Sequence, residues 1–165
     1  MAMKSKLIVA FILGTVLLRL PPLHAQTPTL AGSWQFTLSP GAGSTDPVVF
    51  ALATFTTDGS MIETDSSEVS GIAAATRSTR ATGGHGIWQP APVPGNLYLQ
   101  FISLIINPNG SVYLQKKVTI FGAMDSSGNN FSGTYSYTLT NPVGGFVGSG
   151  SGTIAGERIP HPLLP

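Results

Sequence analysis

Short stretches in which apolar and polar residues alternate follow one another along most of the chain beyond residue 26. In residues 130–140, for example, Phe131, Tyr135 and Tyr137 share one side, while serines and threonines take the other. A strand turns successive side chains to opposite faces, so this spacing is typical of a strand with one wet face. No window shows sustained apolar spacing of about 3.6 residues. The pattern predicts an all-β protein.

Turn residues divide the chain into eight such stretches. Gly, Asn, Asp and Pro gather at 57–60, 107–110, 125–129 and 141–145, which indicates tight hairpins between antiparallel neighbours. We therefore expect an eight-stranded antiparallel up-and-down barrel, a meander that closes by pairing its last strand with its first. The expected strands are 32–38, 48–57, 60–65, 85–89, 97–107, 111–122, 130–140 and 146–158.

Glycines occupy alternate positions in the last stretch, at Gly148, Gly150, Gly152 and Gly156. A strand with one bare face is weak unless bulky side chains lie against it or the sheet curls tightly, and a small barrel provides both conditions. We expect Trp34, Tyr135 and Tyr137 of the neighbouring strands to use this room. The side chains expected to line an interior ligand cavity are Trp34, Phe36, Phe50, Leu99, Phe101, Tyr135 and Tyr137.

Two longer connections interrupt the pattern. Residues 39–46 form a Gly/Ser/Pro-rich loop that could overhang one mouth of the barrel, and residues 66–84 include a stretch, 72–77, that is compatible with one helical turn. Long connections in compact domains are often functional or mobile. For residues 66–84 we favour a solvated loop with no role, and a functional loop is the alternative interpretation.

The first 25 residues have the pattern of a signal peptide. Two lysines precede an apolar run at 7–18, which is shorter than the roughly 20 residues of a membrane-spanning helix, and Ala25 offers a small residue before a cleavage point. An uncleaved membrane anchor is the alternative. We expect a secreted or periplasmic protein with one domain at 26–159 and a Pro-rich tail at 160–165.

The charge and the lack of cysteine exclude several classes of partner and cofactor. Without the leader, five basic residues stand against seven acidic ones, and no basic patch points to nucleic acid or a membrane surface. The chain has no cysteine, and His85 and His161 lie far apart, so we expect no disulfide, no metal site and no cofactor. The expected partner is a small hydrophobic molecule.

Candidates for catalysis are few. His85 could act as a general acid or base if Glu63 or Asp65 oriented it, and Tyr98 is a further candidate. Alternatively, His85 begins a strand at the rim and bonds a loop carbonyl. No nucleophile elbow or phosphate-binding loop occurs.

The stretch 97–107 is apolar on both faces. Because a barrel wall in water needs a polar outer face, either a loop or a second copy must cover its outer side. The second option predicts a homodimer through Tyr98, Ile102, Leu104 and Ile106.

The sequence Gly32-Ser33-Trp34, together with Arg158 in the last strand, resembles the lipocalin or calycin signature. The resemblance implies that Trp34 and Arg158 pack together and seal one end of a ligand-binding barrel. The segments 56–59 and 85–88 are similar to small secreted bacterial barrels related in shape to allene oxide cyclase. That resemblance implies a hydrophobic cavity and, in some members, isomerase or cyclase activity.

Three functions remain compatible with the sequence. A binding module, which we favour, predicts a hollow apolar interior, and an enzyme predicts the same cavity with a polar group pointing into it. A structural or assembly protein predicts a filled barrel that works through its outer apolar face.

Overall fold

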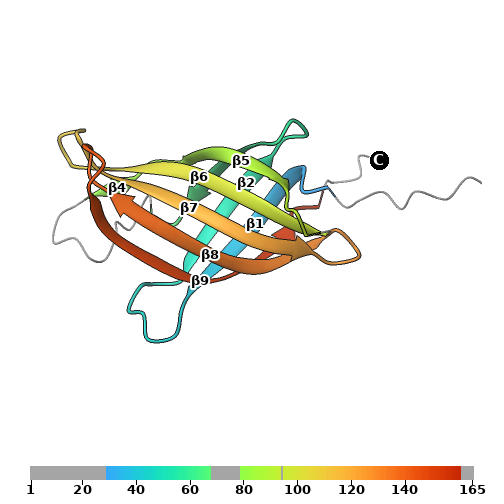
Figure 1. Ribbon diagram of the computed structural model, residues 1–165. Coiled ribbons are helices and arrows are strands. Elements are labelled where there is room, and N and C mark those ends of the chain that lie inside the picture. The colour runs from blue at the N-terminus through green and yellow to red at the C-terminus, as the bar shows by residue number, and fades with distance from the viewer. Residues whose placement is uncertain (1–28, 68–78, 94, 161–165) are drawn as a thin grey trace, which may run out of the picture.

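The chain forms a closed, eight-stranded antiparallel β-barrel (Figure 1). The computed structural model describes residues 29–67, 79–93 and 95–160, and every regular element that lies wholly within these ranges is a strand. A ninth, two-residue strand pairs at the rim. The strands are β1 (Gly32–Pro40), β2 (Val49–Phe55), β3 (Ser60–Asp65), β4 (Arg80–Ala81), β5 (Gly84–Pro90), β6 (Asn96–Ile106), β7 (Val112–Met124), β8 (Asn130–Thr140) and β9 (Phe146–Arg158).

Strand order around the barrel follows the chain. Apart from the short β4, each strand pairs with the next one in the chain, and β1 closes the ring by pairing with β9, with Trp34 opposite Arg158 and Leu38 opposite Ile154. The short β4 pairs with β6 ahead of β5, so both lie along the same edge of β6. The expected up-and-down barrel is confirmed.

All eight expected strands are present, with ends that shift by at most a few residues. The sequence pattern did not predict β4, because two residues are too few to show alternation. Thr82, which follows β4, makes two hydrogen bonds with Leu104 of β6. Its amide donates to the Leu104 carbonyl at 2.8 Å, and its hydroxyl accepts from the Leu104 amide at 3.0 Å. The expected signal peptide, the helical turn at 72–77 and the tail beyond Pro160 lie outside the described residues.

Aromatic side chains fill the interior near one end. The rings of Trp34 and Phe36 stack with centroids 6.0 Å apart, and Phe36 meets Phe55 and Phe131 edge-on at 6.1 and 5.8 Å. All four side chains are at most 5% exposed. Offset and edge-on ring pairs stabilise a core beyond their buried area.

The glycine-rich face of β9 points inward, as expected. A Cβ atom at Gly156 would lie 2.3 Å from the Phe36 ring, and one at Gly150 would lie 2.5 Å from Tyr137. At Gly152 it would meet the Ser39 carbonyl and the ring of Tyr135. The missing side chains therefore make room for the neighbours, although Phe36 takes the place expected for Trp34.

Candidate functional site

One end of the barrel is closed around Trp34 and Arg158, and we call it the sealed end. The guanidinium carbon of Arg158 lies 4.5 Å from the centroid of the fully buried Trp34 ring. Arg158 also donates to three main-chain carbonyls, those of Thr29, Ala31 and Gly128, at 2.6 to 3.0 Å. Burial lowers the pKa of the guanidinium from its usual value. The arginine thus joins the segment before β1 to the turn between β7 and β8.

The centre of the barrel is tightly packed. Three of the expected lining residues, Phe36, Leu99 and Phe101, surround a void of about 20 Å³, which is room for roughly one water molecule. Among the described residues, Glu63 is the only charged side chain that lines this void, and it is 5% exposed. A ligand of ordinary size does not fit this part of the interior.

The expectation that Phe50 lines the interior is wrong. Along β2, Ala51, Ala53 and Phe55 are buried, so the alternation sends Phe50 outward, where it is 62% exposed. It contributes to a hollow of about 630 Å³ on the outer face of the sheet. In β2 the small alanines face the interior and the larger Phe50 and Leu52 face outward. Larger apolar residues usually face the core, so the sequence pattern led to the wrong face for Phe50.

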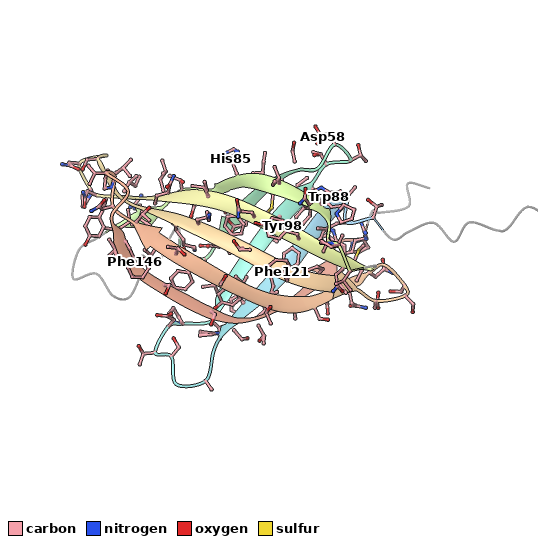
Figure 2. The ribbon with its side chains drawn as sticks, viewed as in Figure 1. Asp58, His85, Trp88, Tyr98, Phe121 and Phe146 are labelled. Carbon is pink, nitrogen blue, oxygen red and sulfur yellow. The ribbon has the colours of Figure 1, made fainter. Side chains whose placement is uncertain are left out.

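The structure does not bring the three catalytic candidates together. His85 pairs with Ile62 and Ile102 and is exposed on the outside of β5 (Figure 2). Tyr98 also faces outward, with its ring 5.0 Å from that of Phe121. Glu63 is in register with the neighbouring Gly84 and points inward. His85 and Glu63 therefore lie on opposite faces of the sheet, and the expected acid–base pair is not formed.

The other end of the interior carries the polar groups of Asp65, Ser103, Lys116 and Tyr137, and the exposed Asp46 of the β1–β2 loop lies beside Tyr137. We call this the polar end. Asp65 of β3 accepts from the ammonium group of Lys116 of β7 at 3.2 Å, and the two side chains are 6% and 15% exposed. Because β5 and β6 separate these strands in the ring, the ion pair spans the lumen.

Hydrogen bonds and charge set the protonation of Asp65. Burial alone would raise its pKa, but the Lys116 ammonium and two hydrogen bonds donated by Ser67 outweigh that effect, so the pKa is lowered. The carboxylate therefore stays ionised at neutral pH.

The loop between β1 and β2 reaches the polar end through a tyrosine. The Tyr137 hydroxyl donates to Asp46 of this loop at 2.9 Å. Partial burial and the neighbouring Asp46 carboxylate raise the pKa of Tyr137 to about 12 and also raise that of Tyr135. Tyr135 is buried and Tyr137 is half-buried, so both expected lining residues face the interior.

Two hydroxyl groups of the described residues are buried without a hydrogen-bond partner. They belong to Ser103 on β6 and to Thr79 just before β4, whose side chains are 3% and 2% exposed. Folded proteins contain few such groups, and each one calls for an explanation such as a bound water or ligand.

Sequence reasoning overlooked Lys116 and Ser103, although a signal was present. Lys116 shares the inward face of β7 with Leu114, Val118 and Ile120, so a charge interrupts an otherwise apolar row. Ser103 interrupts the inward row of β6 in the same manner. Lys117, the next residue, is exposed on the opposite face of β7.

The four residues of the expected dimer face all lie outside, but only Ile102 is exposed, at 39%; Tyr98, Leu104 and Ile106 are half-buried. A broader apolar stripe crosses the outer face of β2, β3, β5 and β6 instead. We call it the outer stripe, and its members are Phe50, Leu52, Ile62, Ile87 and Ile102, between 39% and 62% exposed.

Within the described ranges, no cluster of three His, Asp or Glu side chains could hold a metal ion. In the same part of the chain, no helix is long and apolar enough to cross a membrane. Comparison of the chain with protein-family models, curated proteins and solved structures finds no match.

Proposed function

We propose that this barrel binds a small, mainly apolar molecule at the polar end of its interior. The observation that carries the proposal is the contrast between the two ends. Trp34 and Arg158 close the sealed end with packed rings and main-chain hydrogen bonds, whereas the polar end holds an ion pair and a buried hydroxyl on an otherwise apolar wall. A few polar groups placed in an apolar cavity are typical of small-molecule sites, where they fix the orientation of the ligand.

The packing of the centre supports this location. The void beside Glu63 has room for about one water, so we place the proposed ligand nearer to Lys116 and Tyr137 than to Phe101. We therefore propose a site at one end of the interior rather than along the whole barrel.

Mass spectrometry under native conditions tests the proposal directly. Protein purified from its own host should carry a bound small molecule, and refilling the emptied protein with an apolar fluorescent dye should saturate at one equivalent. Leu139→Trp should abolish dye binding, because the half-buried Leu139 lies on the inner face of β8. Ser136→Trp is the matched control on the exposed outer face. Unchanged binding in Leu139→Trp would place the ligand elsewhere.

We do not extend the proposal to isomerase or cyclase chemistry. With His85 and Tyr98 outside the barrel, Glu63 is the one catalytic candidate that faces the interior. General acid–base catalysis needs a group within hydrogen-bond reach of the substrate, and the void beside Glu63 is too small for a substrate.

A second proposal concerns self-association through the outer stripe. Ile62, His85 and Ile102 lie side by side in one register row across β3, β5 and β6. Five large side chains at about half exposure offer roughly 500 Å² per copy, and two copies together reach the lower limit of specific interfaces, about 1,000 Å². A second copy of the chain is the partner we propose for this face.

We also propose that the mature protein begins near Gln26 and acts outside the cytoplasm, on the basis of the leader pattern alone. Amino-terminal sequencing of the protein recovered from the periplasm or the medium tests this assignment. A chain that starts at Met1 there would contradict it.

A further inference from the structure

The unpartnered hydroxyl of Ser103 lies in a row of residues that crosses the wall of the polar end. The register pairs Ser103 with Lys116, Lys116 with Leu139, and Leu139 with Gly148 across β6, β7, β8 and β9. Residues paired in this manner lie about 5 Å apart and turn their side chains to the same face. The row therefore forms a continuous strip of the inner wall.

Open space lies beside this strip at Gly148. A Cβ atom there would meet no other atom within 4 Å, whereas the Cβ positions of Gly150 and Gly156 are blocked by Tyr137 and Phe36. The glycine-rich face of β9 is thus filled by neighbouring rings at Gly150 and Gly156 and left unfilled at Gly148. An apolar group of a ligand can lie against Gly148 without displacing a side chain.

Lys116 supplies further hydrogen-bond donors beside Ser103. Its ammonium group has three donors, and among the described residues it donates to Asp65 alone. The remaining donors and the Ser103 hydroxyl suit an acceptor oxygen on the ligand.

Charge at this end disfavours an anionic ligand. Asp65 neutralises Lys116 at 3.2 Å, and Asp46 adds a second carboxylate where the Tyr137 hydroxyl meets the β1–β2 loop. Burying a carboxylate without a free cation is costly, whereas a carbonyl oxygen needs only donors.

We propose that Ser103, Lys116 and Gly148 form a subsite for the uncharged carbonyl head of an apolar ligand, with the adjoining apolar part lying against Gly148. This inference deepens the proposed function and rests on it. Ser103 and Lys116 donate hydrogen bonds to the carbonyl oxygen of the ligand, and the open space at Gly148 accommodates its apolar part.

A charge series of ligands tests the proposal by calorimetric titration of the mature protein. The probes are methyl nonyl ketone, decanoate and decylamine, which share an alkyl chain and differ in their head groups. The ketone should bind at least about 10-fold more tightly than decanoate, because the carboxylate loses its hydration without gaining a free cation. Equal or tighter binding of decanoate or decylamine would overturn the assignment of the head group.

Variants locate the subsite. Ser103→Ala should weaken ketone binding by about 3- to 10-fold, the usual contribution of one hydrogen bond, and Gly148→Val should weaken it by at least about 10-fold through steric exclusion. The matched controls are Ser149→Ala and Ser149→Val, which alter the exposed neighbour of Gly148 on the outer face. Circular dichroism and denaturant midpoints establish that each variant is folded.

The results distinguish a failure of the proposed subsite from a failure of the proposed binding function. If the ketone binds but Ser103→Ala and Gly148→Val behave like their Ser149 controls, the subsite is wrong and Ser103 contacts only water, while binding at the polar end survives. If none of the three probes binds, both the subsite and the proposed binding function are overturned.

Discussion

Arg158 lies over the ring of Trp34, with 4.5 Å between the guanidinium carbon and the ring centroid, and the two residues are opposite one another where β9 pairs with β1. The Trp34 ring nitrogen also donates to the Leu30 carbonyl at 2.8 Å, so both members of the pair bind the segment that precedes β1. The contact thus joins the first and last strands and closes one end of the barrel.

Removing the Trp34 ring should destabilise the whole barrel. Trp34→Ala deletes a fully buried ring that packs on Phe36 and Arg158, and such truncations cost about 3–5 kcal/mol. Denaturant unfolding measures the change. Phe146→Ala, which removes a ring that is 69% exposed, is the control and should cost little. An unchanged midpoint for Trp34→Ala would show that the sealed end does not contribute to stability.

The ion pair of the polar end should control the titration of Asp65. Lys116→Met should raise the pKa of Asp65 above its wild-type value, because burial then opposes ionisation without a nearby cation. Lys117→Met alters the exposed neighbour and should leave this pKa unchanged. Carboxyl-carbon NMR titration reads the value directly, and equal shifts in both variants would contradict the ion pair.

The ion pair of Asp65 and Lys116 also stabilises the folded state, and this stabilisation depends on pH. The folded-state pKa of Asp65 lies below the unfolded value of 3.8, so its stabilisation is fully present above that pH and is lost as the pH falls through the folded value. Below about pH 4, the free energy of unfolding of Asp65→Asn should therefore depend less steeply on pH than that of the wild type. An unchanged slope would assign the acid sensitivity to other carboxylates.

The strands were predictable because each carries its own alternation and ends in a turn with Gly, Asn or Asp. In the turn between β7 and β8, for example, Asp125 accepts hydrogen bonds from the Ser127 hydroxyl and from Asn130, and these bonds lower its pKa. Local sequence contains all the information that such a turn needs.

The polar end was not predictable to the same degree. Asp65 and Lys116 are separated by 51 positions in the chain, and only closure of the ring brings their side chains together across the lumen. Alternation could place Lys116 inside, but it could not identify its partner. Phe50 was misplaced for a different reason. Its aromatic side chain suggested a place in the core, but the register of β2 turns it outward.

Glycines of β9 should respond to alanine according to what faces them. Gly156→Ala places a Cβ atom 2.3 Å from the Phe36 ring and should cost about 1–3 kcal/mol through overpacking. Gly148→Ala meets open space at an ordinary backbone φ, so it should be neutral or stabilise by up to about 1 kcal/mol through the unfolded state. Thermal unfolding compares the two variants. Equal destabilisation would mean that Gly148 is also enclosed.

The outer stripe gives the last prediction, which concerns the number of chains in solution. The sequence pointed to a dimer face along β6, but Leu104 and Ile106 are half-buried and Ile102 is its one exposed member. Ile62, at 58% exposure, lies two strands away in the same register row as Ile102, so the apolar surface runs across the strands rather than along one of them. Two copies related by a two-fold axis would bury this stripe against itself, the commonest arrangement of a homodimer.

Sedimentation of the mature protein distinguishes this dimer from a monomer. Ile62→Lys should convert the dimer to a monomer, because each copy would bring an unpaired charge to the apolar contact. Val147→Lys introduces the same charge on β9, at a position that is 51% exposed and outside the stripe, and should leave the dimer intact. Circular dichroism should remain β-like in both variants, since the substituted side chains point away from the core. A wild-type protein that sediments as a monomer even at the highest concentration at which it stays in solution would reject self-association through this face, because an interface of about 1,000 Å² lies at the weak end of specific contacts and associates only at high concentration.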